Sequence, residues 1–89
     1  MKKNLTFTTQ VFREGKQYVS FNPELEVASC GKTPQEAKEK LREAIAGFIT
    51  VALKRGTLDS ILEQAGFVKK KNSWHDPEPI SLDRLTISV

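Results

Sequence analysis

The tetrapeptide Thr-Pro-Gln-Glu constrains the fold of this 89-residue chain more than any other local feature. Thr33 is a good N-cap residue, Pro34 suits the first helical position, and Glu36 falls three residues after the cap. These are the parts of a capping box with a helix-starting proline. The pattern predicts a helix over residues 34–55, with Gly56 as its C-terminal cap. Apolar residues recur through it at helical spacing and form one stripe, made of Ala37, Leu41, Ala44, Ile45, Phe48 and Ala52.

Three segments before this helix alternate polar and apolar residues with a period of two, which is typical of strands. They span residues 4–12, 18–21 and 25–29. Gly15 favours a tight hairpin between the first two, because glycine accepts a positive φ. Pro23 cannot donate a ladder hydrogen bond, so the second strand should end there. The apolar positions of the three segments are Leu5, Phe7, Val11, Val19, Phe21, Leu25 and Val27.

The pattern after the long helix is less regular. A short helix is predicted over residues 57–66, and two prolines interrupt the segment that follows. Residues 83–89 alternate again, with Leu85, Ile87 and Val89 on one side, and predict a closing strand.

These segments predict one α+β domain over residues 1–89, with a core at 4–56, a short helix at 57–66 and a C-terminal loop and strand at 67–89. Three N-terminal strands and one C-terminal strand would form an antiparallel sheet, with the long helix and the short second helix on one face. A chain this small buries little surface, and the other face of the sheet would be solvated or covered by a second subunit. We therefore expect a homo-oligomer, either a dimer or a tetramer.

Residues suited to catalysis are few. His75 is the only histidine and Cys30 the only cysteine. Glu24 and Glu26, two apart on a predicted strand, would share one face, where solvated carboxylates are the simpler interpretation. The histidine, cysteine and acidic residues show no metal-ligand spacing. The Gly-Lys-Thr at residues 31–33 lacks the upstream glycine of a phosphate-binding loop. We predict no catalytic, metal or cofactor site.

A short basic run offers an alternative function. Lys69, Lys70 and Lys71 precede Trp74, and lysines beside an exposed aromatic ring can bind phosphate and stack a base. Together with Arg84 they form a candidate nucleic-acid site. The net charge of +3 is mild, and a solubilising turn with a packed tryptophan is the competing interpretation.

The compartment is predicted from what the chain lacks. A lone cysteine cannot form an intrachain disulfide, which favours a reducing compartment. The first twelve residues alternate polar and apolar types, so they lack the apolar run of a signal peptide. We expect a cytoplasmic protein that is not bound to a membrane.

Residues 18–49 resemble the HicB-like antitoxin family. An aromatic strand runs into Pro-Glu-Leu, a short strand with Val and Ser reaches Gly, and Thr-x-x-Glu-Ala opens a helix with a second Glu-Ala at Glu43 and Ala44. The final Arg-Leu-Thr-Ile-Ser-Val looks like the closing strand of the family. The resemblance implies a β-β-β-α-β domain related to a truncated RNase H fold, without nuclease activity.

The resemblance also implies a partner, a small HicA-like toxin that cleaves mRNA and that the antitoxin binds and neutralises. Trp74, His75, Pro77 and Pro79 are the residues that we expect to contact it. Many family members continue into a DNA-binding segment, whereas residues 67–89 contain two prolines and a strand pattern instead of a helix pair. A nucleic-acid-binding module and a solitary HicB-like protein with another task remain the alternatives.

Overall fold

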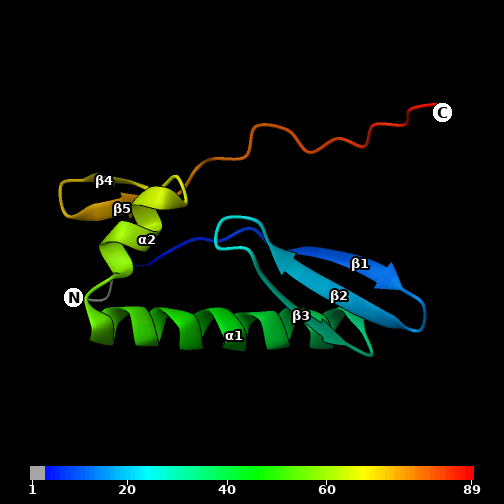
Figure 1. Ribbon diagram of the computed structural model, residues 1–89, viewed down its shortest axis with the longest axis horizontal. Helices are drawn as coiled ribbons and strands as arrows, with labels where there is room; N and C mark the ends of the chain where they lie inside the picture. The colour runs from blue at the N-terminus through cyan, green and yellow to red at the C-terminus, as the bar shows by residue number, and fades with distance from the viewer. Residues whose placement is uncertain (1–3) are drawn as a thin grey trace.

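The computed structural model describes residues 4–89 and shows a small antiparallel sheet, a long helix, a short helix and a hairpin (Figure 1). The sheet has three strands in the order β1-β2-β3. The elements are β1 (Gln10–Glu14), β2 (Gln17–Asn22), β3 (Val27–Gly31), α1 (Pro34–Arg55), α2 (Leu58–Gln64), β4 (Val68–Lys70) and β5 (Ser73–His75). The α+β class is therefore confirmed. No helix in the described part of the chain is long and apolar enough to span a membrane.

Helix α1 has the bounds that the sequence predicts. The Thr33 hydroxyl accepts a hydrogen bond from the backbone N–H of Glu36 at 3.0 Å, and Pro34 occupies the first turn. Gly56 ends the helix with a φ of 70°, a left-handed conformation that glycine adopts without strain. Local capping therefore sets both ends of the helix.

The hairpin between β1 and β2 also follows the local sequence. Glu14 pairs with Gln17, so Gly15 and Lys16 form a two-residue turn. Gly15 has a φ of 63°, which matches a turn with glycine at its first central position.

The first strand is shorter than predicted. It begins at Gln10, and residues 4–9 have no strand partner. The backbone of Thr8 forms hydrogen bonds with side chains instead. Its N–H donates to Glu24 Oε1 at 2.6 Å, and its carbonyl accepts from Asn22 Nδ2 at 2.8 Å. These side-chain hydrogen bonds replace strand pairing, so the expected strand over 4–12 is wrong for residues 4–9.

The third strand begins two residues later than predicted, at Val27. Residues 23–26 form a turn, and Asn22 Oδ1 accepts from the Leu25 N–H at 2.7 Å. Glu26 has a φ of 58°, outside the range of a strand. The expectation that Glu24 and Glu26 share one strand face is wrong. Glu24 is half-buried and hydrogen-bonded, not solvated.

The long helix packs on the sheet through small residues, chiefly against β3 and then β2. The Ser20 hydroxyl donates to the carbonyl of Ala37 at 2.7 Å, and both residues are buried. Gly31 lies so close to the helix that a Cβ there would stand 2.6 Å from the Ala37 nitrogen. Leu41 is fully buried one turn later. Backbone therefore approaches backbone where the helix meets the sheet.

The second half of α1 has different neighbours. Helix α2 packs against α1 and not against the sheet, so the prediction of both helices on one sheet face is wrong for α2. Leu62 and Phe67 are buried there, and the Phe7 ring lies 5.5 Å from the Phe67 ring. Residues 4–9 connect this region to the sheet (Figure 1). Two residues of the predicted apolar stripe, Ala44 and Phe48, are exposed.

The predicted fourth strand is absent from the described residues. Residues 83–89 form no strand, and every residue from Glu78 to Val89 is exposed. The chain instead forms an additional hairpin, β4–β5, in which Val68 pairs with His75. Alternation alone does not make a strand, because the segment also needs a partner edge.

We predict opposite effects for two glycine-to-alanine substitutions. Gly31→Ala should destabilise the fold by about 1–3 kcal/mol, because the added methyl group forces α1 away from β3. Gly47→Ala, inside α1 with no atom near the new methyl group, should stabilise it by about 0.5–1 kcal/mol through helix propensity. Urea unfolding followed by circular dichroism measures both, and an equal effect of the two changes would contradict the close helix–sheet contact.

We also predict that Asn22→Ala destabilises the fold by about 1–3 kcal/mol, because the N–H of Leu25 and the carbonyl of Thr8 lose their partners. Gln17→Ala on the same strand, at an exposed position, should change the free energy of unfolding by less than about 0.5 kcal/mol. Amide exchange of Leu25 should accelerate only in the Asn22 variant. Unchanged exchange there would show that the side-chain bonds do not hold the turn.

Candidate protein-binding surface

One face of the three-stranded sheet is apolar and lies opposite the long helix. Side chains of paired residues in an antiparallel sheet share a face, and successive residues alternate between faces. Ser20 faces α1, so its neighbours along β2 point away from the helix. The residues that pair with them on β1 and β3 share this side of the sheet. We define the outer sheet face by its apolar members Phe12, Val19, Phe21, Ala28 and Cys30.

This outer sheet face is open. Phe12 is 58% exposed, Ala28 and Cys30 are exposed, and Val19 and Phe21 are half-buried. Neither helix covers it, because α1 packs on the other face and α2 packs on α1. The outer edges of β1 and β3 also have no strand partner within residues 4–89. An apolar face between two free edges is suited to contact with another protein.

The β4–β5 hairpin brings together most of the site residues that the sequence suggested. Lys71 and Asn72 both have positive φ values, 49° and 66°, which match a two-residue hairpin turn. Trp74 is half-buried, and the Lys69 ammonium lies 5.7 Å from the centre of its ring. Lys69 also lies 3.7 Å from Asp59 of α2. The tryptophan is therefore partly occupied by contacts within the chain.

The other predicted residues are placed less uniformly. His75 is exposed at the end of β5, and Pro79 is exposed beyond it. Pro77 is half-buried, and a Cβ added at Gly66 would lie 3.6 Å from its ring. Arg84 is not part of the lysine hairpin, because it lines a cavity with residues of β1. The predicted nucleic-acid set is thus divided between two places in the fold.

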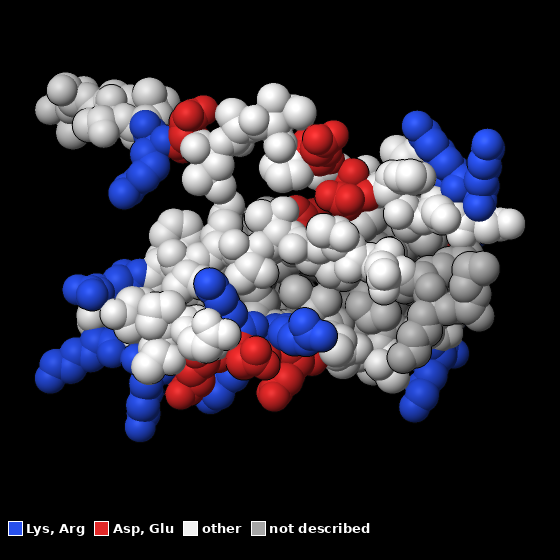
Figure 2. Space-filling view, turned by 180° about the vertical axis from the view of Figure 1, so that it is seen from behind, with Lys and Arg blue, Asp and Glu red and all other residues white. Residues whose placement is uncertain are grey.

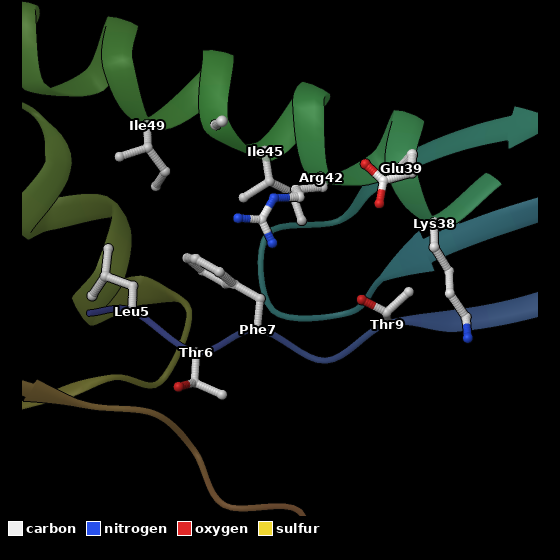
Figure 3. Close-up of a pocket in the computed structure, with 10 residues that line it drawn as sticks. Leu5, Thr6, Phe7, Thr9, Lys38, Glu39, Arg42, Ile45 and Ile49 are labelled. Atoms are coloured by element: carbon white, nitrogen blue, oxygen red, sulfur yellow. The ribbon is translucent and has the colours of Figure 1, made fainter. Parts of the chain in front are cut away.

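A groove of about 690 Å³ lies between residues 4–9 and α1 (Figure 3). Its apolar lining includes Phe7, Ile45 and Ile49, and both charge signs are present at Arg42 and Glu39. In Figure 3 the Phe7 ring points toward the helix, between Ile45 and Ile49. The sequence did not reveal this groove, because residues 4–9 were expected to pair in the sheet.

The charged side chains of both signs are spread over the molecule. Figure 2 shows Lys and Arg at both ends of one face and also near its middle, where they lie beside Asp and Glu side chains. Within residues 4–89, no three His, Cys, Asp or Glu side chains gather into a metal-binding group. Cys30 on β3 and His75 on β5 belong to different sheets.

Comparison with protein-family profiles, with curated proteins and with solved structures produced no match for this chain.

Proposed function

We propose that this chain is a non-catalytic, HicB-like antitoxin that binds and neutralises a small HicA-like toxin that cleaves mRNA. The resemblance of residues 18–49 to the HicB-like family supports this proposal, and so does the β-β-β-α order of the first four elements. The observation that carries it is the outer sheet face, whose apolar side chains are exposed or half-buried and whose one charged side chain on β1 and β2, Glu14, lies at the hairpin end.

The energetics favour a protein partner for this face. A phenylalanine buries about 150–250 Å² in a protein interior, so covering the exposed part of Phe12 removes roughly 100 Å² of apolar surface from water. At about 25 cal/mol per Å², that contact contributes roughly 2–3 kcal/mol to binding. The neighbouring positions Val19, Phe21 and Ala28 extend the apolar area across all three strands.

Neutralisation needs no reacting group on the antitoxin. A rigid sheet held over the RNA-binding side of the toxin excludes the substrate by steric overlap. The free edge of β3 adds backbone donors and acceptors that fix the orientation of the partner. Trp74, His75, Pro77 and Pro79 are the candidates for additional contacts at the other end of the molecule.

The proposal predicts that the chain co-purifies with a HicA-like toxin from the same genome and relieves its growth arrest. Phe12→Asp should weaken the complex by at least about tenfold, because it puts a charge into the apolar contact. Leu53→Asp is the matched control: Leu53 is also exposed, at 62%, but lies on α1 away from the outer sheet face. This control should bind like the unmodified chain.

Isothermal titration calorimetry gives the affinities, and co-expression gives the growth phenotype. Growth arrest that persists with the unmodified chain would contradict the antitoxin role for that toxin. Equal weakening by the two aspartate variants would contradict the use of the outer sheet face.

The lysine hairpin supports a second candidate function, the binding of single-stranded nucleic acid. Lys70 and Lys71 are exposed, and within residues 4–89 neither pairs with a carboxylate. They belong to the same hairpin as Trp74, whose half-buried ring can stack a base once Lys69 moves aside.

This second candidate predicts measurable binding to a single-stranded oligonucleotide at low salt. Changing Lys70 and Lys71 to glutamine should flatten the slope of log affinity against log salt by about 1.4, since each lost phosphate contact contributes about 0.7. Changing Lys16 and Lys54 to glutamine removes the same charge elsewhere. It should reduce the slope by less than the change of Lys70 and Lys71 does. Fluorescence anisotropy measures both, and equal losses would indicate non-specific attraction only.

A further inference from the structure

The last ten residues form an extended tail with an unusual surface. We define the tail as residues 80–89; it forms no helix or strand and makes no hydrogen bond with the other described residues. Its large apolar side chains are almost fully exposed, with Leu85 at 84%, Ile87 at 69% and Leu82 at 71%. Figures 1 and 2 both show it projecting from the body of the molecule. So much exposed apolar surface in one short segment indicates a missing partner.

The pattern of the tail is that of a strand. Leu85, Ile87 and Val89 alternate with Thr86 and Ser88, and most of these residue types favour extended backbone. The tail carries one aspartate and one arginine, so its charge is balanced and does not oppose self-association. It lacks only an edge to pair with.

The free edge of β1 is complementary to such a strand. Within residues 4–89 β1 pairs only with β2, so its other side presents unpaired backbone groups. Phe12, the most exposed aromatic residue of the outer sheet face, lies on this strand. Residues 82–84 of the tail already line a cavity of about 370 Å³ with residues 9–12, yet no ladder forms between them.

The direction of the tail argues against its pairing with β1 of the same copy. In Figure 1 the tail and β1 run the same way, so pairing within the chain would be parallel. A two-fold axis perpendicular to the strands reverses the direction of the partner's tail. The same two segments from different copies then pair antiparallel, which is the slightly more stable arrangement per residue.

We propose that the tail of one copy adds as an edge strand to β1 of a second copy, and that the exchange is reciprocal in a two-fold dimer. In this dimer Leu85, Ile87 and Val89 lie on the same side as Phe12 and extend the outer sheet face. Thr86 and Ser88 point to the opposite side. Both free β1 edges are covered, and both tails lose their exposure.

This inference does not depend on the antitoxin role, because it concerns only copies of this chain. It can be tested on the purified full-length protein without any toxin. A negative result there leaves the toxin-binding experiment unaffected, and the reverse also holds.

Sedimentation equilibrium of the full chain over a concentration series should show a dimer. The double change Leu85→Asp and Ile87→Asp should raise the dimer Kd by about 100-fold, because it places charges against the apolar face. Thr86→Asp with Ser88→Asp is the matched control: it adds the same charge on the other side of the strand and should shift the Kd by less than about fivefold. Thermal unfolding at low concentration checks that both variants fold.

A cross-linking experiment identifies the partner of the tail. In a Cys30→Ser background, a chain with Phe12→Cys is mixed with a chain with Ile87→Cys under mild oxidation. Disulfide-linked heterodimers should form, and Ser88→Cys in place of Ile87→Cys should give far fewer. A monomeric full chain, a dimer that both double variants weaken equally, or a dimer without these cross-links would each overturn the proposal.

Discussion

The close approach of α1 to the sheet is the constraint on which the rest of this fold depends. Gly31 has no side chain, Ala37 has a methyl group, and Ser20 returns a hydrogen bond to the helix backbone. Small residues on both elements let the helix lie almost against the strands. One consequence is that the helix-facing side of the sheet is partly polar, since both Ser20 and Asn22 are buried and hydrogen-bonded there.

The same constraint exposes the other side of the sheet. Because Ser20 and Asn22 face α1, Val19 and Phe21 of β2 face outward, together with Phe12, the β1 partner of Val19. Phe12 and Val19 would be core residues in a two-layer domain whose helix lay on their side. Here they make a surface, which the proposed antitoxin function and the proposed tail exchange both use. A domain this small has one helix to cover one face.

Asn22 links the sheet to the remainder of the molecule. Its amide binds the carbonyl of Thr8 and the carboxylate of Glu24, and its oxygen holds the turn at Leu25. These bonds end the pairing of β1 and direct residues 4–9 along α1 toward Phe67. The second apolar cluster and the groove beside α1 both follow from that path.

The sequence by itself determined the features that depend on neighbouring residues: both ends of α1, the Gly15 hairpin and the alternation that places Val19 and Phe21 on one face. Only the tertiary structure decided which face α1 covers, where β1 begins, and that residues 83–89 lack a strand partner in one copy. It also separated Arg84 from Lys69, Lys70 and Lys71. The physical reason is that caps and tight turns are satisfied within a few residues, whereas a strand or a binding surface exists only relative to what packs beside it.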